Sequence, residues 1–76
     1  MSHSTEDKLV YMANQIATAF GQLKHEEAVA QTRTHIAKFW DPRMRAKIAD
    51  HVAHGGEGLS AIAKQALEGL PPVKAA

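Results

Sequence analysis

The Trp40-Asp41-Pro42 step near the middle of the chain is the strongest constraint on the fold. Proline disfavours helical backbone at the residue before it, so a helix that arrives here is expected to stop. Aspartate is a favoured N-cap, and a proline at the first helical position sacrifices no hydrogen bond. The sequence therefore predicts that one helix ends near Phe39 and another begins at Pro42, with Asp41 and Pro42 as structural caps.

Apolar residues recur at spacings of three and four on both sides of this step, which is the period of an amphipathic helix. The pattern predicts helices over residues 4–23, 25–39, 42–52 and 60–70. Gly55 and Gly56 are expected to end the third helix through left-handed backbone, and Ser60 is expected to cap the fourth. The break between the first two helices is weakly marked, so one long kinked helix is the alternative there.

The predicted fold is all-α, a small bundle of three to four short helices, because no segment alternates apolar and polar residues as a strand does. Residues 1–70 are expected to form a single helical domain, followed by a disordered, flexible tail over residues 71–76. Phe39 is expected to lie mostly in the core. The pattern leaves Trp40 open between the core and the surface.

The chain has 76 residues and no cysteine. A domain of this size buries only about 60% of the surface that its unfolded chain exposes, so it is marginally stable without disulfides, a metal or a partner chain. The lack of cysteine excludes iron–sulfur ligation by this chain and any cysteine nucleophile. No catalytic, cofactor-binding or metal-binding residue is predicted, and the sequence favours a subunit of a larger assembly.

Two other classes of protein are weaker alternatives. A helix-turn-helix DNA-binding regulator would use the Gly55–Gly58 turn and would place residues 60–70 against DNA. Those residues contain only one basic side chain, Lys64. The net charge of +1 also gives no electrostatic support for nucleic-acid binding. A metal site would use His51, His54 and Glu57, but histidines near a helix end also commonly contact free carbonyls.

No apolar run approaches the roughly 20 residues that a membrane-spanning helix needs. The N-terminal residues are polar and acidic, unlike a signal peptide, so a cytoplasmic location is expected.

Several strings in the chain resemble the delta subunit family of NAD-dependent formate dehydrogenases. The strings are Lys8-Leu9-Val10, Met12-Ala13-Asn14-Gln15-Ile16, His25-Glu26-Glu27-Ala28-Val29-Ala30, His35-Ile36, Lys38-Phe39-Trp40-Asp41-Pro42-Arg43-Met44-Arg45, Gly55-Gly56-Glu57-Gly58-Leu59 and Ala66-Leu67. The resemblance covers about residues 8–70. Tyr11 replaces an expected basic residue, and Ser60 replaces an expected aspartate.

The resemblance implies a non-catalytic accessory subunit of a cytoplasmic complex that oxidises formate to carbon dioxide and reduces NAD. Such a subunit would support assembly or stability of the large catalytic subunit, its partner in a hetero-oligomer. The molybdenum or tungsten pterin, the iron–sulfur clusters, FMN and NAD would be bound by other subunits.

Partner-binding residues are predicted in two places. Trp40, Arg43 and Arg45 are of types enriched at protein interfaces, and they are the main docking candidates. Asn14 and Gln15 are expected either to offer side-chain hydrogen bonds to a partner or to form a polar helix face.

Overall fold

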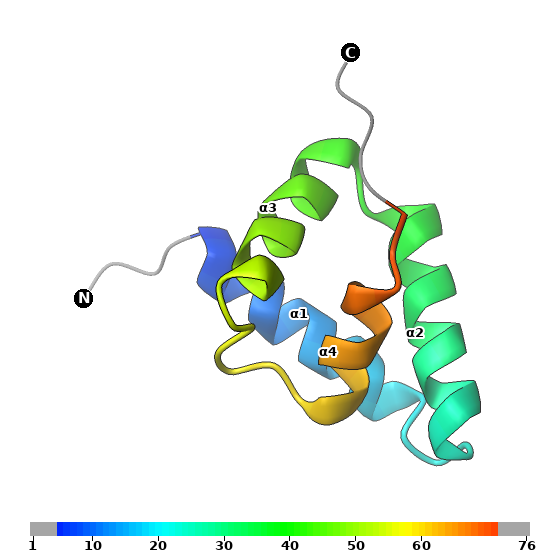
Figure 1. The fold of residues 1–76 in the computed structure, drawn as a ribbon. Helices are drawn as coiled ribbons and strands as arrows, with labels where there is room; N and C mark the ends of the chain where they lie inside the picture. Colours follow the sequence, from blue (N-terminus) through cyan, green and yellow to red (C-terminus); the bar gives the residue numbers. More distant parts are fainter. Residues whose placement is uncertain (1–4, 72–76) are drawn as a thin grey trace.

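A computed structural model describes residues 5–71. Four α-helices follow one another: α1 (Thr5–Ala19), α2 (His25–Phe39), α3 (Pro42–Ala53) and α4 (Ala61–Glu68). In Figure 1, α2 and α3 stand on opposite sides and α4 lies between them. Both α1 and α4 contact every other helix, whereas α2 and α3 have little direct contact. The prediction of an all-α bundle is confirmed, and the described residues include no strand.

The joint between α1 and α2 is longer than the sequence suggested. The predicted first helix extended to Leu23, but α1 ends at Ala19 and tight turns follow. Gly21 explains the early end, because glycine lowers helix stability by about 1 kcal/mol relative to alanine. The Gly21 amide instead bonds back to the Thr18 carbonyl at 3.0 Å. The alternative of one long kinked helix is therefore wrong.

The corner between α2 and α3 is built as its residues predict. The Trp40 amide donates to the Ile36 carbonyl and closes α2, and Asp41 then adopts extended backbone. The Asp41 side chain accepts a hydrogen bond from the Met44 amide at 2.9 Å, with Pro42 at the first helical position. Capping of this kind contributes about 1 kcal/mol and sets the direction in which α3 leaves.

Two glycines end α3 in a Schellman motif. The Gly56 amide donates to the His51 carbonyl and the Gly55 amide donates to the Val52 carbonyl, both at 3.0 Å. Gly55 has φ +112° and Gly56 has φ +64°, values that residues with a side chain rarely adopt. Ser60 then caps α4 by accepting from the Ala63 amide at 3.2 Å.

The core lies between α1, α2 and α4, with α3 covering one end through Ile48. Its most buried apolar members are small or aliphatic, apart from one indole. They are Leu9, Ala13, Ala17, Ala28, Ile36, Trp40, Ile48, Ala63, Ala66 and Leu67. The many alanines let the helix axes approach closely, and Trp40 supplies the largest single apolar surface.

Phe39 does not lie in the core, contrary to the prediction. Its side chain is 70% exposed, whereas Trp40 is 5% exposed. The buried positions of α2 advance in steps of four through Ala28, Thr32 and Ile36, and Trp40 continues that series. Trp40 therefore takes the last core position. Phe39, at the last residue of the helix, is left on the surface.

Arg33 fastens the end of α4 to α2. Its Nε donates to the Ala66 carbonyl at 3.0 Å and its Nη2 donates to the Gln65 carbonyl at 3.1 Å. These carbonyls belong to the last turn of α4, whose acceptors have no partner within the helix. A Cβ at Gly69 would overlap the Arg33 guanidinium, so a side chain at that position would have to displace the guanidinium.

Two predictions at the chain ends fall partly outside the description. Residues 1–4, which include the predicted start of the first helix at Ser4, and residues 72–76 of the predicted tail lie outside the described residues.

The buried hydroxyl of Thr32 generates a prediction. Thr32 is 0% exposed, and its Oγ1 has no hydrogen-bond partner among the described residues. An unsatisfied buried hydroxyl costs about 1–3 kcal/mol, so Thr32→Val is expected to raise the free energy of unfolding by about 1 kcal/mol. Urea unfolding followed by circular dichroism measures this change in the free energy of unfolding. Thr34→Val is the matched control, because the exposed Thr34 hydroxyl donates to the Ala30 carbonyl. A loss of stability in Thr32→Val would contradict the assignment.

Candidate partner-binding surface

Large apolar side chains gather on the surface where α1, α2 and α3 meet. Tyr11 is 65% exposed, Met12 39% and Phe39 70%. Single exposed apolar residues are common on soluble proteins, but a contiguous group marks an interaction site more often. These three residues border one groove, so they form a contiguous group.

The groove has a volume of about 400 Å³ and draws its walls from three helices. We call it the docking groove, and its lining residues are Tyr11, Met12, Gln15, Ile16, His35, Phe39, Trp40 and Met44. Trp40 is the most buried of them and joins the groove to the core. The lining residues come from the middle of α1, the end of α2 and the start of α3, so the groove lies beside the Asp41 corner.

A second apolar hollow extends the docking groove along α1. It is lined by Asp7, Lys8, Tyr11 and Met12, so Tyr11 and Met12 belong to both hollows. The exposed apolar surface therefore runs along about two turns of α1. An elongated surface of this kind is suited to a helix or an extended segment of another chain.

A row of rings stiffens the α2 side of the groove. The His35 ring lies 4.7 Å from the Phe39 ring between centroids, and 6.4 Å from the Phe20 ring in an edge-on arrangement. Ring pairs at these separations attract one another beyond simple area burial. Phe39 is thus exposed and also held by a neighbour, which reduces the entropy that it would lose on docking.

The predicted docking residues at the corner are separated by the fold. Trp40 is buried and lines the groove, Arg43 is exposed, and Arg45 is partly buried. The Nε atom of Arg45 is buried without a hydrogen-bond partner among the described residues. Of these three residues, only Arg43 offers a freely accessible charge. The docking role of Trp40, Arg43 and Arg45 remains a prediction.

The predicted polar pair on α1 is also separated. Gln15 is exposed and lines the docking groove. The Asn14 side chain turns the other way, donates to the Gly58 carbonyl and accepts from the Ser60 amide, both at 2.9 Å. Asn14 therefore holds the α3–α4 turn against α1, and both ends of its amide are engaged within the chain.

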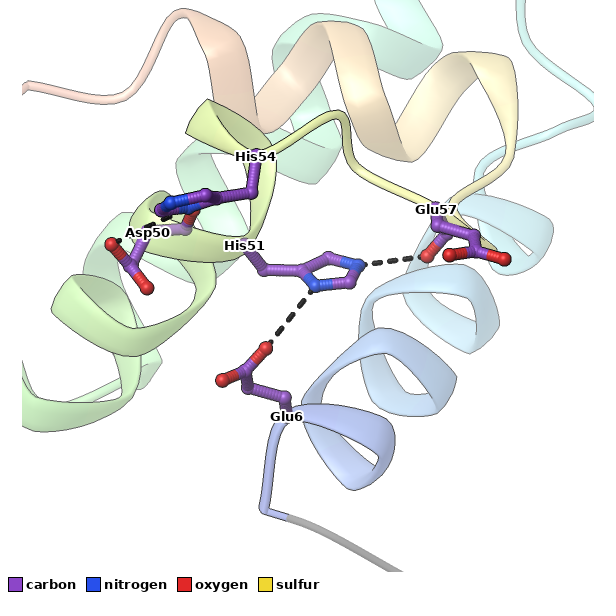
Figure 2. A network of polar contacts seen from close by, with 5 residues as sticks. All are labelled: Glu6, Asp50, His51, His54 and Glu57. Carbon is purple, nitrogen blue, oxygen red and sulfur yellow. Dashed lines mark hydrogen bonds and ion pairs between the residues drawn. The ribbon is translucent and has the colours of Figure 1, made fainter.

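The histidines considered for a metal site are used in other ways (Figure 2). His51 lies 3.3 Å from the Glu6 carboxylate through Nδ1 and 2.7 Å from the Glu57 carbonyl through Nε2. His54 faces Asp50, one turn earlier on α3. Within residues 5–71, no three His, Asp or Glu side chains converge as metal ligands do. His51 instead links the start of α1, the end of α3 and the glycine turn.

His54 stabilises the C-terminal end of α3. Its Nδ1 lies 2.8 Å from the Asp50 carbonyl and 3.7 Å from the Asp50 carboxylate. The hydrogen bond to that carbonyl, followed by the nearby carboxylate, raises the pKa of His54 above its ordinary value of 6.5. A cation at a helix C-terminus is the favourable arrangement, so this histidine has a local structural role.

The helix-turn-helix alternative has no support in the packing of α4. Ala63, Ala66 and Leu67 of this helix are buried, and α4 contacts all three other helices. A recognition helix must present one long face to the major groove of DNA. The Asn14 clamp and the Arg33 contact tie both ends of α4 into the bundle instead.

Sequence reasoning missed the main members of the docking groove. Tyr11, Met12 and His35 were not proposed as partner contacts, and Phe39 was assigned to the core. Tyr11 carried the one available signal, since it lies outside the helical stripe that contains Leu9 and Ala13. Whether a stripe residue near a helix end is covered depends on its neighbours in the fold, which the period alone does not specify.

Within the part of the chain described, no helix is long and apolar enough to cross a membrane. The fold and the groove define a small helical protein with an exposed apolar groove.

The particular family follows from comparison with known families. The model of the NADH-dependent formate dehydrogenase delta subunit family, FdsD, matches residues 8–67, and the chain belongs to this family. Its members are subunits of an NAD-dependent formate dehydrogenase, so the protein functions in a hetero-oligomer. Comparison with curated proteins and with solved structures finds no significant match.

The Asn14 clamp gives a prediction with a matched control one residue away. Asn14→Ala removes two hydrogen bonds and leaves the Ser60 amide without its acceptor. The free energy of unfolding is expected to fall by about 1–3 kcal/mol. Gln15→Ala, at an exposed position of the same helix, is expected to change it by less than about 0.5 kcal/mol. Urea unfolding measures both, and equal effects of the two variants would contradict the clamp.

Proposed function

We propose that the protein is a non-catalytic accessory subunit that binds the large molybdopterin catalytic subunit of a cytoplasmic NAD-dependent formate dehydrogenase and supports its assembly or stability. The observation that carries the proposal is the docking groove. At its borders, Tyr11 is 65% exposed and Phe39 is 70% exposed to solvent, and the protein's own core is small. Covering this surface would stabilise the complex by burying apolar area.

A non-catalytic role is supported by the side chains available. The chain has no cysteine, the residue that ligates iron–sulfur clusters. Its half-buried polar side chains Asn14, Arg33 and His51 contact other parts of the chain. We therefore assign the molybdenum or tungsten pterin, the iron–sulfur clusters, FMN and NAD to other subunits.

The first experiment is a pull-down of the tagged chain from its native host. Mass spectrometry identifies the co-purifying proteins, and formate-dependent NAD reduction is assayed in the eluate. Recovery of a large molybdopterin-type subunit with activity supports a resident subunit, whereas recovery without activity supports an assembly role on immature enzyme. Recovery of DNA, or of the chain alone, would contradict the proposal.

The groove makes a more specific prediction for the same pull-down. Phe39→Gln removes an exposed ring from the groove and leaves the core intact, because Phe39 contributes little to the core. Exposed aromatic anchors commonly contribute more than 1.4 kcal/mol to binding, so affinity for the complex is expected to fall about tenfold or more.

The matched control is Ala30→Gln, at an exposed position of α2 nine residues earlier and therefore on the opposite side of that helix. It is expected to leave the affinity unchanged. Circular dichroism establishes that both variants keep their helical content. Equal recovery of the complex with Phe39→Gln and with the unaltered chain would exclude the groove as the docking surface. Arg43→Ala tests the contribution of the accessible arginine in the same assay.

A further inference from the structure

Basic residues flank the docking groove on each of its three helices. Lys8 lies beside Tyr11 and Met12 in the hollow on α1. On α2, the exposed Lys38 follows the groove residue His35 by three positions, which places the two on neighbouring parts of the helix surface.

The α3 side of the groove carries two further cations. Arg43 and Lys47 are both exposed and lie four residues apart, so they share one flank of α3. Met44, which lines the groove, lies beside them, since Lys47 follows it by three positions. Together with Lys8 and Lys38, these two residues form what we call the basic rim.

The carboxylates near the rim do not balance these four cations. Asp41 is engaged as the cap of α3, where it accepts the Met44 amide, and Asp50 faces His54. Asp7 lines the same hollow as Lys8. Counted at their formal charges, the four cations of the basic rim exceed the three carboxylates of Asp7, Asp41 and Asp50 by one, so a small positive excess lies beside the groove.

From this arrangement we propose that the docking groove receives an amphipathic helix of the large catalytic subunit, with Asp or Glu residues on both flanks of its apolar face. The proposal rests on the function proposed above. The apolar lining fits side chains spaced as on one helix face, and the elongated hollow follows α1. Carboxylates on the flanks would meet the basic rim, which favours this orientation and increases the association rate at low salt.

Photo-crosslinking in the assembled complex tests the occupant directly. The photoreactive residue p-benzoylphenylalanine replaces Phe39 in the tagged full chain, expressed in the native host. The same residue at position 30, on the opposite side of α2, is the control. After irradiation, the crosslinked peptide is sequenced by mass spectrometry. The expected peptide belongs to the large catalytic subunit, has apolar residues at helical spacing and contains several Asp or Glu residues.

A basic or uncharged crosslinked peptide would overturn the proposal while leaving subunit membership intact. A peptide from a different subunit, or from a second copy of this chain, would do the same. So would equal crosslinking from position 30. Failure of the tagged chain to retain any formate dehydrogenase subunit would instead refute the proposed function, and the inference with it.

Charge reversal provides the second measurement. A triple variant with Lys8→Glu, Lys38→Glu and Lys47→Glu is expected to lower recovery of the complex at least tenfold, with the effect decreasing as salt concentration rises. Lys24→Glu, between α1 and α2 and away from the groove, is the control and is expected to have no effect. Undiminished recovery with the triple variant, whose helicity is verified by circular dichroism, would overturn the acidic character of the partner.

Discussion

The inward position of Trp40 at the corner between α2 and α3 is the contact on which the rest of the structure depends. The indole completes the buried series of α2, is 5% exposed, and lies directly before the Asp41 cap that starts α3 in a new direction. Because Trp40 fills the last core position, Phe39 is left outside. Because α3 starts at this corner, its Met44 lines the docking groove beside Phe39 and Trp40. The core and the docking groove are thus two consequences of one turn.

Polar contacts hold α4 and the turn before it against the other helices. Asn14 clamps the α3–α4 turn to α1, Arg33 binds the last carbonyls of α4, and His51 joins α1, α3 and the glycine turn. A domain with so many alanines in its core gains little from apolar burial, so such contacts are needed to fix α4 in place. These contacts also give a structural role to polar residues that would otherwise suggest a metal-binding or catalytic site. The apolar surface is left as the part of the molecule available to a partner.

Much of the fold could be predicted from local sequence rules, and the docking groove could not. The Asp41-Pro42 corner, the Gly55-Gly56 stop and the Ser60 cap depend on neighbouring residues, and each forms as those rules predict. The end of α1 depended on a balance between periodicity and the cost of Gly21, and the prediction there was wrong by several residues. The position of Phe39 was predicted wrongly, and the internal contacts of Asn14 were not predicted, for a different reason. Asn14 meets a turn more than 40 residues away, and Phe39 is exposed because Trp40 replaces it, so both depend on tertiary packing.

We propose that another subunit of formate dehydrogenase covers the docking groove. The most direct measurement is an electron cryo-microscopy structure of the complex purified through this chain. We expect Tyr11, Met12 and Phe39 to lose their solvent exposure against a helix of the large catalytic subunit, while α4 keeps its packing within the bundle. A structure in which these three side chains face solvent and a different surface of the chain contacts the enzyme would contradict this proposal.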